Sequence, residues 1–309
     1  MFYNMRTKYY LTHPYSIFLR LIMKMNEQGI HFPDKFYISK YYRFLVGENI
    51  DWKNPRKYNE KINWIKLYDQ RPIYTTMVDK VEAKKYVASI IGEKYIVPTL
   101  AVYDKVDEIN WEELPNKFVI KCNHDSASYT ICKDKSQLDR LATIERLSKA
   151  LSTDFFWIAR EWAYKNVKKR ILVEELLEDP DGDLKDYKFF CFNGEVKAMF
   201  IATDRQNANV ETKFDFFDAD FNHLPMTSHH PNANPWPQKP KSFELMKELA
   251  AKLSQGIPHV RVDFYEVNGI PYFGEFTFYH DGGTAPLCPV EFEYKFGDWF
   301  ELPQEKTIE

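Results

Sequence analysis

Hydrophobic residues recur at helical spacing through the first quarter of the chain. In the segment YNEKINWIKLY, Tyr58, Ile62 and Ile65 fall three or four positions apart and form one apolar stripe. No alternation of strand and helix interrupts this region, so we predict a helical N-terminal segment over residues 1–75. The pattern continues through TTMVDKVEAKKYVASII, which predicts one helix over residues 75–91.

An apolar segment near the start, SIFLRLIMKM, is interrupted by Arg20 and Lys24 and is preceded by Pro14. These charges exclude a membrane-spanning helix. We expect a packed N-terminal helix. The alternative is a basic amphipathic helix that makes a peripheral contact with the inner face of a bacterial cell membrane. On either interpretation the protein is expected to be cytoplasmic.

Beyond residue 92 the pattern changes to short apolar runs bounded by polar turns, which are typical of strands. Three such runs occur in the segments YIVPTLAVY, NKFVIKCNH and YTICKDK. A predicted helix over residues 136–149 and the strand-like segment ILVEELLE follow them. We therefore predict a small α+β domain over residues 76–172.

The rest of the chain begins after a DPDG turn and is rich in strands. Asn193-Gly194 predicts a hairpin within KDYKFFCFNGEVKAMFIAT, and ETKFDFFDADFNHL adds a further strand. The segment SFELMKELAAKLSQG predicts a helix capped by Ser242 and closed by Gly256. We predict a larger C-terminal domain with a mixed or antiparallel sheet over residues 173–309, and an α+β fold for the whole chain.

The strongest chemical signal lies in VRVDFYEVNGIPYFGEFTF, residues 260–278, where charged residues interrupt two apolar strands joined by Asn-Gly. Because strand side chains alternate between faces, Arg261 and Asp263 share one face of the first strand, and Glu275 and Thr277 share one face of the second. If the two faces coincide, the hairpin presents two carboxylates to a cation. Mg²⁺ suits such a face because it takes one or two carboxylates and completes its shell with water and phosphate oxygens. The alternative is an ordinary surface salt bridge from Arg261.

The length of the turn decides whether the two faces coincide. A two-residue turn at Asn268-Gly269 sets the two carboxylates on opposite faces of the hairpin. A three-residue loop over residues 267–269, with Gly269 in the left-handed conformation as a bulge, brings them to the same face. We predict the three-residue loop, because the other register leaves a carboxylate on the apolar face, where an unpaired charge is costly.

Composition and short motifs exclude several classes of protein. The formal net charge of -3 and the isoelectric point near 6.3 give no general attraction to nucleic acid. Neither G-x-G-x-x-G nor a P-loop motif occurs, which excludes a Rossmann or P-loop nucleotide site. The four cysteines stand singly and predict neither a zinc site nor a disulfide framework. His223, His229 and His230 lack further ligands at fixed spacing, so we assign them to a loop and not to a metal site.

Two lysines are candidates for binding a phosphate. Lys121 stands in the otherwise apolar strand segment FVIKCNH, so its ammonium group must emerge toward a cleft or a partner. Lys80 lies on the predicted helix over residues 75–91. Further along, the backbone of ILVEELLE can offer N–H and C=O groups to the edge of an adenine ring.

In this order, these segments resemble the ATP-grasp superfamily and, within it, the TupA-like family linked to bacterial polysaccharide and teichuronopeptide synthesis. The resemblance covers most of the chain, through FPDKFYISKYYRFLVG, YNEKINWIKLYD, FVIKCNH, ICKDKS, REWAYKNVKKRILVEELLE, KDYKFFCFNGE, VRVDFYEVNG and YFGEFTFY. It implies an ATP-grasp fold, with adenine received at the hinge between the two strand-containing domains. It also implies ATP and Mg²⁺ as cofactors.

The resemblance implies a role for individual residues. The residues expected to bind the nucleotide, from the phosphates through the adenine hinge to the ribose, are Lys80, Lys121, Glu174, Glu175, Leu177 and Asp186. Asp263 and Glu275 would bind Mg²⁺, together with Thr277, which stands where the superfamily commonly has an asparagine. Arg261 would face the transferring phosphoryl group, with Lys121 as a further catalytic cation.

The implied activity is formation of an amide through an acyl phosphate, with release of ADP and phosphate. We predict an ATP-dependent carboxylate–amine ligase of capsule or surface-polysaccharide biosynthesis, which joins an amino acid or small amine to a uronic-acid or acidic acceptor. The acceptor can be a small molecule, a nucleotide sugar or a polysaccharide. Arg205 is the candidate clamp for the substrate carboxylate, the alternative being a solvated arginine. Two other functions remain open: a sugar kinase with the same Mg·ATP site, and a non-catalytic nucleotide- or sugar-binding module.

Two features depart from the pattern of the superfamily. The loop after Lys121, residues 124–128, reads HDSAS and has no glycine, and Asp125 adds a negative charge where phosphates are expected. The helical N-terminal segment replaces the βαβ substrate domain of many ATP-grasp ligases. We therefore expect substrate recognition by the aromatic N-terminal region and by the HDGG loop, residues 280–283.

Overall fold

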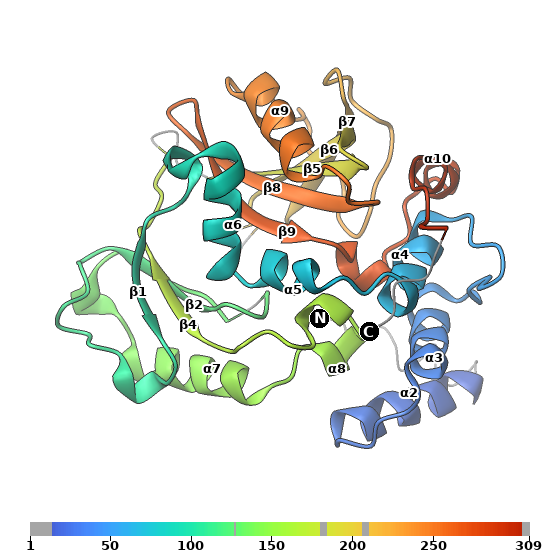
Figure 1. Ribbon diagram of the computed structural model, residues 1–309, viewed down its shortest axis with the longest axis horizontal. Helices are drawn as coiled ribbons and strands as arrows, with labels where there is room; N and C mark the ends of the chain where they lie inside the picture. The colour runs from blue at the N-terminus through green and yellow to red at the C-terminus, as the bar shows by residue number, and fades with distance from the viewer. Residues whose placement is uncertain (1–13, 127, 180–183, 206–209, 305–309) are drawn as a thin grey trace.

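The computed structural model describes residues 14–126, 128–179, 184–205 and 210–304, which form two antiparallel sheets and a set of helices (Figure 1). The helices are α2 (Pro14–Glu27), α3 (Asp34–Val46), α4 (Tyr58–Tyr68), α5 (Pro72–Val78), α6 (Glu82–Ile91), α7 (Arg140–Ser152), α8 (Phe156–Ala159), α9 (Phe243–Leu253) and α10 (Glu291–Trp299). The strands are β1 (Thr99–Tyr103), β2 (Phe118–Cys122), β3 (Thr130–Cys132), β4 (Ile171–Glu174), β5 (Asp186–Phe192), β6 (Glu195–Thr203), β7 (Lys213–Asp218), β8 (Val260–Val267) and β9 (Ile270–Thr277).

The smaller sheet has four strands in the order β1-β4-β2-β3. Phe118, Ile120 and Cys122 of β2 are fully buried in its core, which includes Leu147 of α7. Because side chains alternate along a strand, Lys121 emerges on the opposite face from this core. The local pattern of one strand thus decides that this lysine faces away from α7.

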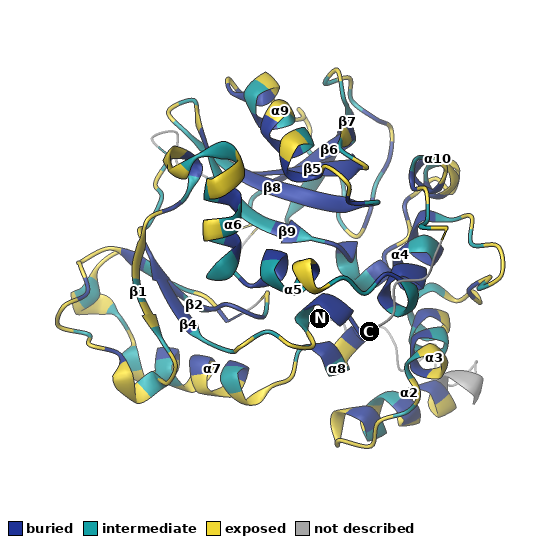
Figure 2. Ribbon diagram, in the orientation of Figure 1, coloured by how far each residue is buried: buried dark blue, intermediate teal, exposed yellow. Residues whose placement is uncertain are grey.

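The larger sheet has five strands in the order β7-β6-β5-β8-β9 and is covered on both faces. All seven residues of β5 are buried, and Figure 2 shows β5 and β8 as dark strands between helices. The ring of Phe189 lies 6.1 Å from that of Phe243 on α9, and the ring of the next residue, Phe190, lies 6.1 Å from that of Tyr58 on α4. A strand without a solvent-facing side gives a continuous apolar run, as in DYKFFCF.

The single helix predicted over residues 75–91 is wrong, because the chain breaks between α5 and α6. Asp79 makes the break: its Oδ1 accepts from the backbone N–H of Val81 at 2.9 Å and from Asn123 Nδ2 at 2.8 Å. The backbone N–H of Lys80 donates to the Asn123 carbonyl oxygen at 3.2 Å. The break therefore ties the start of α6 to the end of β2.

The β8–β9 hairpin closes with a two-residue turn, so the predicted three-residue loop is wrong. Val267 pairs with Ile270 across Asn268 and Gly269, whose φ angles are 53° and 77°. Positive φ at both central positions is the requirement of a type I′ turn, which Asn-Gly meets at little conformational strain.

A bulge inside β9 places Arg261, Asp263, Glu275 and Thr277 on one face of the hairpin, as predicted. Gly274 is the extra residue, since Asp263 pairs with Glu275 while the next residue of β8 pairs with Phe273. Arg261 pairs with Thr277 in the shifted register. A Cβ on Gly274 would lie 3.2 Å from the Asp263 carbonyl oxygen, so the bulge favours glycine. The two carboxylates are therefore direct cross-strand neighbours, although the extra residue lies in the strand and not in the turn.

The helix predicted after Ser242 is present, but its predicted cap is wrong. The Ser242 hydroxyl and backbone N–H both donate to Glu266 Oε2, at 2.5 and 2.6 Å, and the side chain does not bond to the first turn of α9. The helix ends at Leu253, and Gly256 follows with φ of 71°. A carboxylate from β8 thus outcompetes the local capping interaction.

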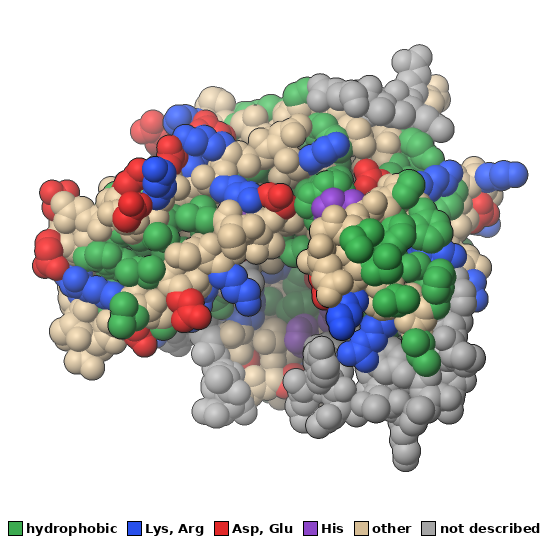
Figure 3. All heavy atoms as spheres, turned by 90° about the horizontal axis from the view of Figure 1, so that it is seen from below, with side chains coloured by type: hydrophobic (Ala, Val, Ile, Leu, Met, Phe, Trp, Pro, Cys, Tyr) green, Lys and Arg blue, Asp and Glu red, His purple; other side chains and the backbone are tan. Residues whose placement is uncertain are grey.

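The helix α2 packs through one face and leaves the other exposed. Leu19 and Ile22 are buried, whereas Ile17 and Leu21 are more than half exposed. Seen from below, hydrophobic side chains gather beside Lys and Arg at the end of the molecule that carries α2 and α3 (Figure 3). Within the described ranges no helix is both long and apolar enough to span a membrane. Residues 1–13 of the predicted helical segment lie outside the described part of the chain.

Gly297 provides a test of how α10 docks beside α4. A Cβ at this position would lie 2.0 Å from the carbonyl oxygen of Arg56, so α10 has to move away from the segment before α4. We expect Gly297→Ala to lower the free energy of unfolding by about 3 kcal/mol, measured by denaturant titration. Gly47→Ala is the control: its φ is 89° and its Cβ would meet open space, so strain alone costs about 1 kcal/mol. Equal losses in the two variants would contradict this account.

Candidate nucleotide and metal site

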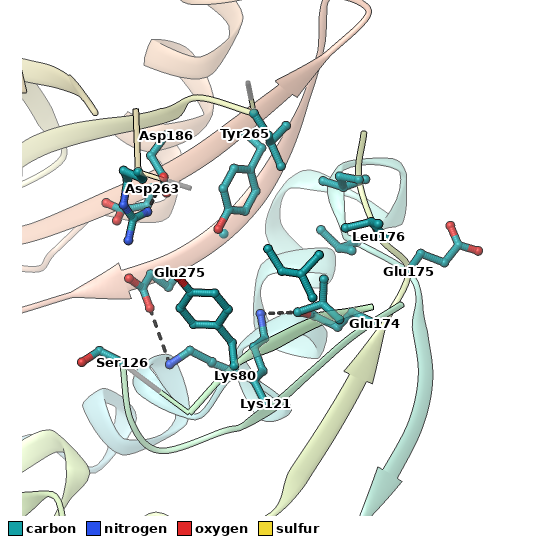
Figure 4. A pocket seen from close by; sticks show the side chains of 18 of the residues that line it. Lys80, Lys121, Ser126, Glu174, Glu175, Leu176, Asp186, Asp263, Tyr265 and Glu275 are labelled. Carbon is teal, nitrogen blue, oxygen red and sulfur yellow. Dashed lines mark hydrogen bonds and ion pairs between the residues drawn. The ribbon is translucent and has the colours of Figure 1, made fainter. Parts of the chain in front are cut away.

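A cavity of about 260 Å³ lies between the two sheets and is the centre of the candidate site (Figure 4). Predicted site residues that line it are Lys80, Lys121, Glu174, Glu175, Leu177, Asp186, Arg205, Asp263 and Glu275. The other two, Arg261 and Thr277, lie behind Asp263 and Glu275 on the same strands. The fold thus brings together residues that are up to 195 positions apart, from Lys80 to Glu275.

The larger sheet contributes a buried pair of opposite charges. The Arg261 guanidinium donates through Nε to Asp263 Oδ1 at 2.7 Å and through Nη2 to Asp263 Oδ2 at 2.8 Å. Nη2 also donates to Thr277 Oγ1 at 3.0 Å. A two-point contact of this kind fixes the plane of the carboxylate. Burial opposes ionisation of Asp263, but Arg261 and Lys188 outweigh it and hold the pKa of this carboxyl below its ordinary value.

Lys188 is a site residue that the sequence analysis missed. It pairs with Asp263 in the β5–β8 register, and its Nζ forms ion pairs with Asp263 Oδ2 and, at 3.3 Å, with Asp186 Oδ1. The other oxygen of Asp186 binds Arg205. Burial alone would raise the pKa of Asp186, but Lys188 and Arg205 lower it below its ordinary value. Two cations therefore hold the carboxyl predicted to contact ribose.

Glu275 faces the cavity and Lys80 (Figure 4). Among the described residues its one ion pair is to Lys80, with 3.5 Å between Lys80 Nζ and Glu275 Oε2. Burial raises the pKa of Glu275, Lys80 lowers it, and the balance lies below the ordinary value. Lys80 Nζ also donates to the Asp125 carbonyl oxygen at 2.6 Å, so one lysine spans the cavity from β9 to the loop after β2.

Lys121 reaches the cavity from the smaller sheet and forms an ion pair with Glu174 Oε2. Lys84 of α6, which the sequence analysis also missed, binds the other oxygen of Glu174 at 2.6 Å. Burial raises the pKa of Glu174, but the two lysines lower it below its ordinary value. The Glu174 side chain is thus a counter-charge for two lysines. Its backbone pairs with β1 and β2, so only the residues from 175 onward of the predicted adenine hinge lie beyond the sheet.

The predicted hinge segment, residues 174–177, has one side toward the cavity. The Glu175 side chain points away from it, and the Glu175 backbone N–H donates to the Pro98 carbonyl oxygen at 3.0 Å (Figure 4). Leu177, half-buried, lines the cavity together with Val97 and Ile131. An apolar slot beside the backbone of this segment suits a flat heteroaromatic ring.

The glycine-free loop after β2 is held by its own side chains. The Ser128 hydroxyl donates to Asp125 Oδ1 at 2.5 Å and accepts from the Cys122 backbone N–H at 2.9 Å. Asp125 and Ser126 line the cavity, and residue 127 lies outside the described ranges. The negative charge of Asp125 is therefore present at the cavity, with a hydroxyl donor on one of its oxygens.

The donor set of the hairpin fits Mg²⁺. Asp263, which is buried, and Glu275, which is partly exposed, are cross-strand neighbours and offer carboxylate oxygens, the ligands that this hard cation prefers. No group of three or more His, Cys, Asp and Glu able to hold a metal occurs in the described part of the chain. A cation held here would complete its shell with the Thr277 hydroxyl, water and phosphate oxygens, which is the usual situation of Mg²⁺.

Two sheets with a lysine-lined cavity between them and a carboxylate pair on one hairpin define the ATP-grasp class of proteins. A family model described as TupA-like ATPgrasp matches residues 60–301. The chain therefore belongs to the TupA-like ATP-grasp family, and the predicted α+β ATP-grasp fold is confirmed.

Solved structures also resemble the chain at low identity. A D-alanine–D-alanine ligase from Bacillus anthracis complexed with ATP is 16% identical, with 66% of this chain and 54% of that chain covered and a TM-score of 0.37. The D-alanine–D-alanine ligase from Helicobacter pylori is 13% identical, with 74% of this chain and 61% of that chain covered and a TM-score of 0.44. The D-cycloserine synthetase DcsG is 14% identical, with 74% of this chain and 70% of that chain covered and a TM-score of 0.40. The chain spans about half the length of the first of these. A comparison with curated proteins finds no match.

The depressed carboxyl pKa values predict how stability depends on pH. Asp186 and Asp263 ionise more readily in the folded chain than in the unfolded chain, so they stabilise the fold above the ordinary pKa. This contribution is lost as the pH falls through the folded pKa, and we expect the free energy of unfolding to drop steeply below about pH 4. Asp186→Asn should give a shallower pH dependence in the same denaturant titrations. An unchanged slope would contradict this explanation.

Lys121 is expected to contribute directly to nucleotide affinity. We expect Lys121→Met to weaken binding of ATP by about 10- to 100-fold, because a charged hydrogen bond to phosphate is lost. Isothermal calorimetry measures the effect. Lys117→Met is the matched control, since it removes an exposed ion pair with Glu178, of 2.7 Å, just before the same strand. Equal affinities of wild type and Lys121→Met would remove this lysine from the site.

Proposed function

We propose that the protein is an ATP-dependent carboxylate–amine ligase that forms an amide through an acyl phosphate. The observation that carries the proposal is the arrangement of charges around one cavity. Asp263 and Glu275 are cross-strand neighbours, Lys188 and Arg261 bind Asp263, and Lys80 faces Glu275. Phosphoryl transfer needs such an arrangement and no protein nucleophile, because catalysis is mostly positioning and neutralisation of charge.

The proposed roles follow the two walls of the cavity. Lys121 and Lys80 hold the α- and β-phosphates. The backbone of the hinge, beside Leu177, receives adenine. When bound, Mg²⁺ supplies Lewis-acid neutralisation of the phosphate charge, and Asp263 and Glu275 are the residues that would hold it.

Lysine and arginine side chains become available to the nucleotide when phosphate oxygens replace the protein carboxylates that bind them. Three cations of the cavity are paired with a carboxylate of the protein: Lys80 with Glu275, Lys121 with Glu174 and Arg205 with Asp186. Phosphate oxygens compete for the same donors, and Mg²⁺ held by Asp263 would supply part of the neutralisation of that carboxylate. Lys188 and Arg261 face the transferring phosphoryl group and orient it for attack by the substrate carboxylate.

We further propose that the acid is a uronic acid or an acidic acceptor of bacterial surface-polysaccharide synthesis, and that the amine is an amino acid or a small amine. Membership of the TupA-like family supports this class of substrate. Arg205 supports it as well, because its side chain lines the cavity, is 44% exposed and can contact a carboxylate in addition to Asp186.

The first test is release of ADP from Mg·ATP by the purified chain with UDP-glucuronate or UDP-galacturonate, with and without mixed amino acids and amines. We expect release that needs both acid and amine. Asp263→Asn should lower it by at least about 100-fold, because the carboxylate that would hold the metal is lost. Asp218→Asn, which changes a carboxyl at the end of β7 away from the cavity, is the matched control.

The same assay separates the other two functions. Dependence on an alcohol acceptor, with a stable phosphorylated product and no need for an amine, would identify a sugar kinase. Binding of ATP without turnover in any mixture would identify a binding module. Either result would overturn the ligase proposal.

A further inference from the structure

A second group of polar residues begins where the candidate site ends, on the far side of Arg261. The guanidinium donates through Nη1 to His280 Nδ1 at 2.7 Å. His280 opens η5 (His280–Gly283), the short helix that follows β9, and is fully buried. None of the residues of η5 lines the cavity between the sheets.

The contact with Arg261 fixes the protonation of His280. Nδ1 accepts a hydrogen bond, so the neutral ring carries its proton on Nε2. Burial lowers the pKa of His280 to about 4, with Asp281 opposing and Arg261 assisting, so the ring is neutral near pH 7. His280 Nε2 lies 3.6 Å from Asp281 Oδ2, which is too long for a direct hydrogen bond. Both atoms are buried without a hydrogen-bond partner in the described part of the chain.

His229 lies on the other side of Asp281 and opens to solvent. Its Nδ1 is 3.4 Å from Asp281 Oδ2, and its side chain is 52% exposed. Asp281 and His229 have φ angles of 46° and 56°, a strained conformation for residues with a side chain. The His229 loop is fixed beside η5 by pairing of Thr227 with Cys288.

A second histidine–aspartate pair in the chain shows what distinguishes this one. His223 Nε2 lies 3.4 Å from Asp215 Oδ1, the same separation. However, His223 is only 16% exposed and stacks on Trp236 with ring centroids 4.3 Å apart, so it has no free approach. The exposed imidazole, and not the separation, makes His229 available to a substrate.

We propose that His229, oriented by Asp281, is the base that takes the proton of the incoming amine, an inference that rests on the ligase proposed above. Nδ1 is the ring nitrogen of His229 that faces Asp281, 3.4 Å from Oδ2, which leaves Nε2 as the proton acceptor. The amine nitrogen forms a bond to the acyl carbon, and the bond from that carbon to the phosphate oxygen breaks. Phosphate leaves with the electron pair, and the proton of the nitrogen passes to His229 Nε2. His280 and Asp281 are positioning residues.

Charges around the pair are consistent with this task. Asp281 raises the pKa of His229 above its ordinary value, against the effect of burial. The neighbouring titratable groups are His230 on the same loop, His280 and Arg261 on the far side of Asp281, and Glu161, which faces η5. A base whose pKa lies close to the working pH is the most effective.

The test separates formation of the acyl phosphate from transfer to the amine. The purified chain receives Mg·ATP and UDP-glucuronate or UDP-galacturonate, with either hydroxylamine or mixed amino acids. Hydroxylamine is neutral near pH 7, needs no base, and traps the acyl phosphate as a hydroxamate. For His229→Gln we expect amide formation to fall by about 100-fold near pH 7 while hydroxamate formation is little changed. Amide formation should recover as the pH rises and the amine loses its own proton.

Two further variants define the outcome. His223→Gln, the matched histidine of the second pair, should leave both products unchanged. Asp281→Asn should shift the acid limb of amide formation to lower pH, because the pKa of His229 loses the contribution of the carboxylate. Equal losses of hydroxamate and amide in His229→Gln, or normal amide formation in it, would overturn the inference and leave the ligase intact. Neither product from the wild type with any pair would overturn the proposed function and this inference together.

Discussion

The two-point contact between Arg261 and Asp263 is the constraint on which the rest of the site depends. Both side chains are buried, and a buried carboxylate is stable only when cations compensate its charge. Because a guanidinium is planar, its pairing with Asp263 fixes the direction of the remaining donors, which reach Thr277 and His280. One arginine thereby sets the hairpin face and the position of η5 relative to each other.

Alternation along strands predicted which residues of the hairpin share a face, but not which extra residue brings them there. Whether two strand residues share a face depends only on whether the number of residues between them is odd or even. An extra residue in the turn and a bulge at Gly274 therefore give the same face, and the sequence does not distinguish them. The break at Asp79 and the contact of Ser242 with Glu266 were beyond prediction for another reason. Their partners lie on segments that only the folded chain brings near.

Of the two lysines missed at the site, one had left a signal. Lys188 stands in the apolar strand DYKFFCF as Lys121 stands in FVIKC, and the argument made for Lys121 applies to it unchanged. Lys84 gave no such sign, because a lysine on an amphipathic helix is ordinarily solvated. Only the approach of α6 to β4 reveals that it shares Glu174 with Lys121. A lysine whose neighbours in the sequence are apolar can be identified from the sequence, whereas a lysine that reaches the site only through tertiary contacts cannot.

The chain enters and leaves the smaller sheet through adjacent residues. Thr99 at the start of β1 pairs with Glu174 at the end of β4, and the backbone N–H of Glu175 donates to the Pro98 carbonyl oxygen. Residues 99–174 are therefore an excursion with neighbouring ends, although α8 and η4 (Trp162–Tyr164) within it return to pack against α2 and α5. The tolerance of proteins to insertions depends on such proximity of the ends. The excursion can accordingly change in length or loop structure during evolution while the path of the chain through the larger sheet stays the same.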